Sequence, residues 1–334
     1  DCLHTVKKRT LETMDAMKRK LALFYAPGAL TFAVLCWGLA PVATRYILQT
    51  SFSALHLLLL RFLLATLLLL PVLIHTLRHQ RIAWTRHEVV LIVAGALTCI
   101  LGYNVTVTFG LQYIPASIGG LLIATEPIWI TLLACLFLHE TLRKTALGGL
   151  VLATSGVVLL IGQSLLHPAI GSQALLGIGL TLLAAMMWGI YTIVVRPLSR
   201  RYGALSSTAL TTIIGTVPLF AFWDTHVIPS ITNFTPSIWI AFLLLAVGST
   251  VVATILWNYG VAHLPGSKAG MFLYLEPVVS VLGSALFLGE HLTLSTFASG
   301  ALIIAGVIVA QLSPGERNVP ESSSSDAILE QTKP

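Results

Sequence analysis

The chain has 334 residues, of which 56% are hydrophobic and only 10% are charged, and its formal net charge is +6. A soluble domain carries about 25% charged residues, so this composition excludes an ordinary soluble protein and favours a chain embedded in a bilayer. The sequence has no basic stretch interleaved with aromatic residues, so the positive charge does not indicate a nucleic-acid partner.

Ten apolar segments follow one another, each near the length of about 20 residues that a helix needs to cross a bilayer. They are predicted at 29–48, 54–76, 88–109, 116–138, 145–163, 173–196, 205–223, 237–258, 269–288 and 292–312. The predicted fold is therefore an all-α membrane protein with ten transmembrane helices.

Two short stretches flank the ten segments. Residues 1–28 are predicted to be a cytoplasmic N-terminal segment, in which Met14 and Met17 are candidate natural starts because position 1 is not Met. Residues 313–334 contain SSSSD and are predicted to be a disordered cytoplasmic tail.

The positions of Lys and Arg predict the orientation of the chain. These residues precede the first segment and follow the second, fourth, sixth and eighth, whereas the alternate loops carry none. Short loops rich in Lys and Arg stay in the cytoplasm, so both termini are predicted to be cytoplasmic. The expected location is a plasma membrane, the inner membrane of a bacterium, crossed many times.

The first five segments and the last five are predicted to be two copies of one unit. The Glu-Pro pair at 126–127 recurs at 276–277, an offset of 150 residues. Because five is odd, the second copy (173–312) enters the membrane from the opposite side to the first (29–163), and the repeats are inverted. Inverted repeats with broken helices and a midplane site are typical of secondary transporters.

Four stretches carry a family resemblance: CWGLAPVATRY, LRFLLATLLLLP, TEPIWITLLACLFLHETLRKTALGGLVLATSGVVLLIG and LEPVVSVLGSALFLGEHLTLSTFASGALIIAGVIV. Together with the doubled Glu-Pro pair, they resemble the drug/metabolite transporter superfamily, in its EamA-type branch of ten-helix carriers, over about residues 29–312. The resemblance implies a solute carrier, often an exporter of amino acids or related metabolites.

Glu126 and Glu276 fall in the middle third of their segments, where an ionised carboxylate costs from about 3 to above 10 kcal/mol. Each is expected to be protonated unless a cation or a water-filled cavity is near. Two interpretations stay open. Each acid binds a proton or the solute, or it donates a structural hydrogen bond to a carbonyl that the next proline leaves free, at Ile123 or Leu273.

A cavity is predicted between the first, third, fourth, sixth, eighth and ninth segments, with walls kinked by Pro41, Pro127 and Pro277. The fifth and tenth segments are rich in small residues and are expected to form peripheral packing or a homodimer face. Further candidates for solute binding are Trp37, Trp188, Tyr103, Asn104, Thr254, Trp257 and Asn258. Hydrogen bonds between helices, at about 1 kcal/mol each, would explain the polar candidates without a ligand.

Three arginines, Arg45, Arg61 and Arg196, are candidates for gates or charge pairs. Arg45 and Arg196 are repeat-related and lie near opposite membrane faces, where snorkelling to headgroups is the alternative. Arg61 lies deeper in the membrane and needs a partner, which is a carboxyl, a cluster of carbonyls or an anionic solute.

Glu140 and Glu290 are also related by the repeat, but they lie at opposite membrane faces. One solute cannot contact both. They are predicted to be structural caps at the starts of the fifth and tenth helices, where a carboxylate satisfies free amides and suits the helix dipole.

These features predict a secondary transporter that moves a small organic solute by alternating access at a midplane cavity, with proton coupling as one means of driving it. The sequence predicts no catalytic residue, no cofactor and no metal site, since HEVVL and HETLR are not HExxH motifs. An intramembrane enzyme acting on lipid is an alternative that would need clustered His/Asp or Ser/Lys groups. A non-transporting accessory subunit is another, which would need a sizeable soluble domain.

Overall fold

The computed structural model describes residues 2–50, 52–79, 85–138, 144–166, 172–223, 234–263 and 271–311, and every regular element in them is helical. The first half contains α1 (Cys2–Leu48), α2 (Ala54–His79), α3 (Arg86–Leu97), the π-helix η1 (Thr98–Val105), α4 (Thr106–Tyr113), α5 (Ala116–Ile123), α6 (Glu126–Leu138) and α7 (Lys144–Leu166). The second half contains α8 (Ser172–Tyr202), α9 (Ala204–Thr216), the 3₁₀ helix η2 (Val217–Phe222), α10 (Pro236–Leu243), the π-helix η4 (Leu244–Ala253), α11 (Thr254–His263), the 3₁₀ helix η5 (Met271–Tyr274), α13 (Leu275–Leu288) and α14 (Leu294–Gln311).

Six helical stretches are long and apolar enough to cross a membrane: Tyr25–Leu48, Ala54–His79, Arg86–Tyr113, Gln173–Tyr202, Ala204–Phe222 and Pro236–Gly260. Four shorter apolar helices are Ala116–Ile130, Leu147–Leu159, Leu275–Leu288 and Leu294–Gly306. Each of these stretches overlaps one predicted segment.

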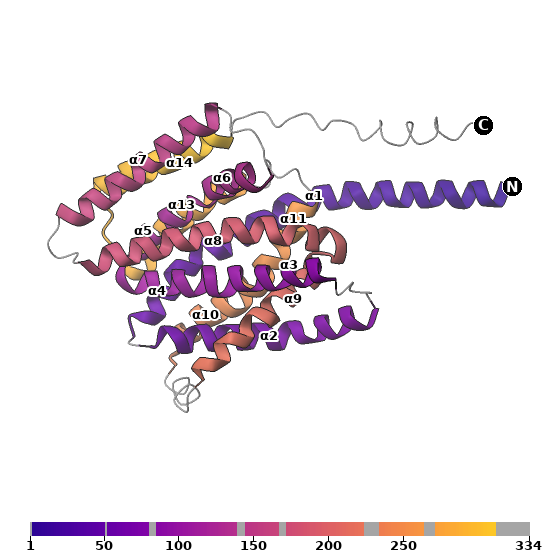
Figure 1. Cartoon of the computed structure of the whole chain (residues 1–334), viewed down its shortest axis with the longest axis horizontal. Helices are drawn as coiled ribbons and strands as arrows, with labels where there is room; N and C mark the ends of the chain where they lie inside the picture. Colours follow the sequence, from indigo (N-terminus) through magenta and orange to yellow (C-terminus); the bar gives the residue numbers. More distant parts are fainter. Residues whose placement is uncertain are drawn as a thin grey trace.

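The first helix begins well before the predicted segment 29–48. Residues 2–28 belong to α1, whose N-terminal part projects from the bundle as a helix (Figure 1). Helix α1 also continues through Pro41 without a break. The tail 313–334 and Glu140 lie outside the described residues.

The helices of the two halves pack against one another in matched pairs. Helix α1 of the first half packs on α13 and η4 of the second half. Helix α8, the counterpart of α1 in the second half, packs on α6 and η1, the counterparts of α13 and η4 in the first half. Helix α2 packs on α9, α5 on α13, and α7 on α14. The pair α7 and α14 lies along one edge of the bundle, beside the other helices (Figure 1).

Repeat-related glycines allow these close approaches. A Cβ atom at Gly38 would lie 2.7 Å from Cβ of Val279, and one at Gly189 would lie 3.2 Å from Cβ of Trp129. The two contacts correspond under the repeat. Small residues let helix backbones approach closely inside a membrane, where van der Waals packing drives association. Each half therefore holds the other by the same kind of contact.

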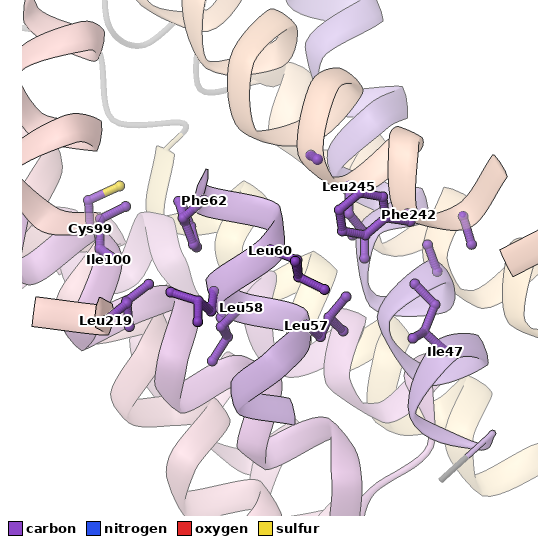
Figure 2. Close-up of a cluster of buried hydrophobic side chains, with 14 of the residues drawn as sticks. Ile47, Leu57, Leu58, Leu60, Phe62, Cys99, Ile100, Leu219, Phe242 and Leu245 are labelled. Carbon is purple, nitrogen blue, oxygen red and sulfur yellow. The ribbon is translucent and has the colours of Figure 1, made fainter. Parts of the chain in front are cut away.

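The largest buried apolar cluster fills the space between α2 and its neighbours. In Figure 2, side chains of α2 point toward α1 and α10 on one side and toward η1 and η2 on the other. The labelled residues are Ile47, Leu57, Leu58, Leu60, Phe62, Cys99, Ile100, Leu219, Phe242 and Leu245. This cluster fixes α2 against both halves and so positions Arg61, which follows Leu60.

We expect Gly156→Leu to lower the melting temperature of the purified protein by several degrees, because a side chain there would meet α14. A Cβ atom at Gly156 would lie 2.8 Å from the carbonyl oxygen of Ser299. Overpacking of this kind costs about 1–3 kcal/mol. Gly148→Leu on the same helix is the matched control, since no atom lies within 4 Å of its added Cβ. Equal melting temperatures for the two variants in thermal unfolding would contradict this account of the α7–α14 contact.

Candidate functional site

Both glutamates of the repeated Glu-Pro pair lie at the start of a helix. The predicted segment 116–138 is broken at residues 124–125, where the amide of Thr125 donates to the carbonyl of Leu122 at 3.1 Å, and Glu126 begins α6. Glu276 is the second residue of α13, after the 3₁₀ turn η5. Proline lacks an N–H, so the position after each glutamate suits the first turn of a helix. The prolines therefore mark helix starts, which corrects the prediction of kinks within continuous helices.

The two glutamates line one cavity of about 50 Å³. Its walls come from α1, α2, η1, α4, α5, α6, α8, α9, η4, α11 and α13. The lining residues are Trp37, Ala40, Pro41, Thr44, Arg61, Phe62, Cys99, Ile100, Tyr103, Asn104, Val107, Leu111, Ile123, Glu126, Trp188, Thr212, Ser249, Thr250, Thr254 and Glu276. The prediction omitted the second and seventh segments, which contribute Arg61 and Phe62 from α2 and Thr212 from α9.

The cavity lining includes two carboxyls, one from each half of the chain. Glu126 and Glu276 are 3% and 4% exposed, and the two groups interact electrostatically. The Tyr103 hydroxyl interacts with Glu126, while Oε1 of Glu126 has no hydrogen-bond partner among the described residues. Two buried carboxyls that interact are costly to ionise together. Oε1 therefore makes no structural bond to a freed carbonyl and is available to a ligand or a proton.

The cavity lining also includes Arg61, which is buried. Its Nε donates to Oγ1 of Thr250 at 2.6 Å, and its Nη2 donates to Oγ of Ser249 at 3.4 Å. A guanidinium has five N–H donors. Within the described part of the chain Arg61 forms no ion pair with a carboxylate. Its positive charge therefore lies against neutral groups, namely these two hydroxyls and the Phe62 ring, whose centroid is 5.3 Å from Cζ of Arg61.

Two π-helical stretches, η1 and η4, shape the walls at corresponding places in the two halves. In η1, Nδ2 of Asn104 donates to the carbonyl of Cys99 at 2.8 Å. In η4, Oγ1 of Thr250 donates to the carbonyl of Leu245 at 2.8 Å, again five residues back. Wide turns of this kind frequently occur at functional sites. Sequence analysis gave no sign of them beyond the polar residues in otherwise apolar segments.

A cluster of aromatic side chains lies beside the cavity, between the two halves. The repeat-related Trp37 and Trp188 meet edge to face, with ring centroids 5.4 Å apart and an interplanar angle of 82°. Trp188 also contacts Tyr103 at 5.0 Å, and Trp37 contacts Trp257 at 5.3 Å. Nε1 of Trp37 donates to the carbonyl of Ser249 at 3.1 Å. These contacts join helices of both halves at the level of the glutamates.

Other candidates lie away from the cavity. Asn258 is buried and donates to Oγ1 of Thr208 at 2.8 Å, so it serves contact between α11 and α9. Trp257 is not among the residues that line the cavity, but its ring contacts that of Trp37, which does line it. Arg196 is exposed on α8, and Pro277 lines a separate apolar groove beside α14.

Arg45 and Glu290 hold the connection between α4 and α5 from two sides. Nη1 of Arg45 donates to the carbonyls of Leu111 and Gln112 at 2.8 and 2.7 Å. The carboxylate of Glu290 accepts from the amides of Ala116 and Ser117 at 2.8 and 3.1 Å, and from the Ser117 hydroxyl at 2.6 Å. Arg45 therefore caps the carbonyl end of one helix, and Glu290 caps the amide end of the next.

Glu290 was predicted to cap the start of the tenth helix, α14, and this prediction is wrong. Oγ1 of Thr293 accepts from the amide of Thr296 at 3.2 Å, so a threonine caps α14. Glu290 instead reaches across to the other half of the chain. Glu290 lies near the start of α14 in the sequence, which suggested a cap there. The packing of α13 on α5 instead brings the start of α5 within hydrogen-bonding distance of the Glu290 carboxylate.

An ion pair missed by sequence analysis joins α3 to the end of α8. Glu88 is buried, pairs with Nη1 of Arg201 and accepts from the hydroxyl of Tyr202 at 2.7 Å. The arginine pair at 200–201 was interpreted only as a topology signal. The available clue was a carboxylate at the first residue of the predicted third segment.

Several known proteins are similar to this chain. An uncharacterized transporter of Archaeoglobus fulgidus is 27% identical over 84% of this chain and 96% of its own length. A probable terminal-alkyne amino-acid exporter of Streptantibioticus cattleyicolor is 29% identical over 64% of this chain and 69% of its own length. A probable amino-acid metabolite efflux pump of Salmonella typhimurium is 27% identical over 64% and 76%.

A protein of known crystal structure shares the fold, with a TM-score of 0.59 and 19% identity over 87% of this chain and 99% of its own. The sequence profile of the EamA-like transporter family matches this chain twice, at residues 26–162 and 175–311. The profile confirms the resemblance found in the sequence. With its long apolar helices, the chain is a multi-pass membrane protein that belongs to the EamA-like transporter family.

Proposed function

We propose that the protein is a secondary transporter that moves a small organic solute by alternating access, with its binding site at the cavity between the two halves. The observation that carries this proposal is that two carboxyls, one from each half, meet in one buried polar cavity. Ionisable groups within a membrane are costly and rare, and they commonly mark ion, proton or solute pathways.

Inverted repeats around a midplane site are one common basis of alternating access in secondary transporters. The matched packing of α1 on α13 and of α8 on α6 supports an inverted pair of five-helix repeats, as does the double match to the family profile. In this arrangement the ten apolar helices all cross the bilayer, and both termini lie in the cytoplasm of a bacterial cell.

The cavity has to widen before it admits a solute. Its volume of about 50 Å³ has room for a few water molecules, whereas solute sites typically measure about 300 Å³ or more. The contacts of Arg45 and Glu290 with the α4–α5 connection lie at the end of α1 remote from the N-terminus. We assign that end to the outer face, where these contacts keep the site closed.

Amino acids or related metabolites are the proposed solutes, and export is the proposed direction. Two relatives carry names that specify amino-acid export or amino-acid metabolite efflux. The pair Glu126 and Glu276 is the proposed proton site, because a negative charge on either carboxyl can be neutralised by a proton or by a cationic group.

A homodimer could form through the outer faces of α7 and α14. The glycine-rich inner faces of these helices are already used within the chain, since a Cβ at Gly306 would lie 2.6 Å from the carbonyl oxygen of Gly149. Only the faces turned away from this contact remain for a second copy.

Transport by purified protein in liposomes is the direct test. Vesicles loaded with a panel of labelled amino acids and amino-acid metabolites are given a proton gradient of either direction, and efflux is compared with protein-free vesicles. We expect at least one solute to leave faster in the presence of protein, and its rate to depend on the gradient. No movement of any solute under any gradient would overturn the proposal.

A further inference from the structure

Arg61 is a buried guanidinium without a carboxylate partner in the described part of the chain. Two of its nitrogens donate to Thr250 and Ser249, and Nη1 makes no hydrogen bond within that part. A charged side chain deep in a membrane is costly and is normally paired. The neutral hydroxyls position the guanidinium but do not neutralise its charge.

The fold does not need this cation to satisfy its neighbours. The Thr250 hydroxyl already donates to the carbonyl of Leu245, and Ser249 gives its carbonyl to the Trp37 indole. A neutral side chain at position 61 would leave these bonds intact. The charge at Arg61 is therefore better explained by a bound group than by packing.

The cavity brings together a cationic side chain and two acidic ones. Tyr103 also lines this cavity and interacts electrostatically with Arg61 and with both Glu126 and Glu276. Arg61 and the two glutamates line the same cavity, yet they form no ion pair with one another in the described residues. A solute in this cavity therefore meets one cationic group and two carboxyls.

We infer that Arg61 is the specificity-determining residue of this site and binds an anionic group of the transported solute, a carboxylate in the first instance. This inference rests on the proposed function. A planar guanidinium with free N–H donors matches a carboxylate in geometry as well as charge. A cationic group on the same solute then lies toward Glu126 and Glu276, so a dipolar solute is held in one orientation.

The test compares acids with their amides, which lack the anionic group but keep the rest of the molecule. L-Leucine, L-methionine, L-phenylalanine and L-threonine are each paired with the corresponding amino-acid amide. Binding to the purified full chain is measured by quenching of tryptophan fluorescence and by thermal shift, and transport is measured separately in liposomes. Wild type is compared with Arg61→Gln, Arg61→Lys and Arg78→Gln, the last an exposed arginine on the same helix.

We expect wild type and Arg78→Gln to bind at least one acid about tenfold more tightly than its amide, which corresponds to about 1.4 kcal/mol. Arg61→Gln should lose this preference, and Arg61→Lys should keep part of it because its charge remains. Partial rescue by lysine also separates a lost contact from a misfolded variant.

Each outcome decides between the two claims. Acid-selective binding without transport supports the inference and overturns the proposed function. Transport without a preference for the acid, or a preference that survives in Arg61→Gln, overturns the inference and leaves the proposed function standing. If no acid binds and none moves, both fail.

Discussion

Glu126→Gln and Glu276→Gln are each expected to lower transport at least about tenfold and to flatten its dependence on pH. Each variant removes a group that can lose a proton while keeping nearly the same shape. Because the two carboxyls interact, their contributions are not independent, and the double variant should cost less than the sum of the two single losses. A tenfold loss corresponds to about 1.4 kcal/mol.

The measurement is the initial rate of transport in liposomes over a pH series that spans neutrality. Glu88→Gln is the matched control, since Glu88 is also a buried carboxyl but lies outside the cavity, paired with Arg201. It should keep the pH dependence of wild type. If both cavity variants transport at the wild-type rate with an unchanged pH profile, the carboxyls have only a structural role.

The pairing of the two glutamates could be predicted because a repeat carries spatial information. An offset of 150 residues relates Glu126 to Glu276, and the corresponding glycines at 38 and 189 pack on the helices that follow these glutamates. Rare residues such as Trp, Pro and Glu make such an offset visible in an apolar sequence. The family followed from the same pattern.

The local form of the site could not be predicted in the same way. A π-helix and an α-helix bury the same apolar residues, so hydropathy does not distinguish η1 and η4 from their flanks. Likewise, the partners of Arg61 and Glu290 lie far away in sequence, at Thr250 and Ser117. The sequence predicted a carboxyl, a cluster of carbonyls or an anionic solute as the partner of Arg61, and a local helix start as the partner of Glu290. The packing of the two halves supplied hydroxyls and a distant helix start instead.

The second large effect is expected at the α4–α5 connection, where Arg45→Gln combined with Glu290→Gln should open one end of the bundle. The two side chains make five hydrogen bonds to residues 111–117, and all of them involve a charged group. Hydrogen bonds to charged groups contribute about 1.5–3 kcal/mol each. Even a net loss of about 2 kcal/mol shifts a closed–open equilibrium about thirtyfold.

Labelling of a cysteine at position 116 with a membrane-impermeant maleimide measures this opening. Ala116 is fully buried at the connection, and the four natural cysteines are first replaced so that only the reporter reacts. We expect labelling to be slow in the otherwise unchanged protein and about tenfold faster or more when Arg45 and Glu290 are both glutamine. Arg78→Gln is the control, because that arginine is exposed at the far end of α2 from the connection. Among the described residues, Arg45 and Glu290 are the charged side chains that bond to the backbone of this connection. Equal labelling rates in the double variant and the control would therefore show that these two side chains do not hold this end closed.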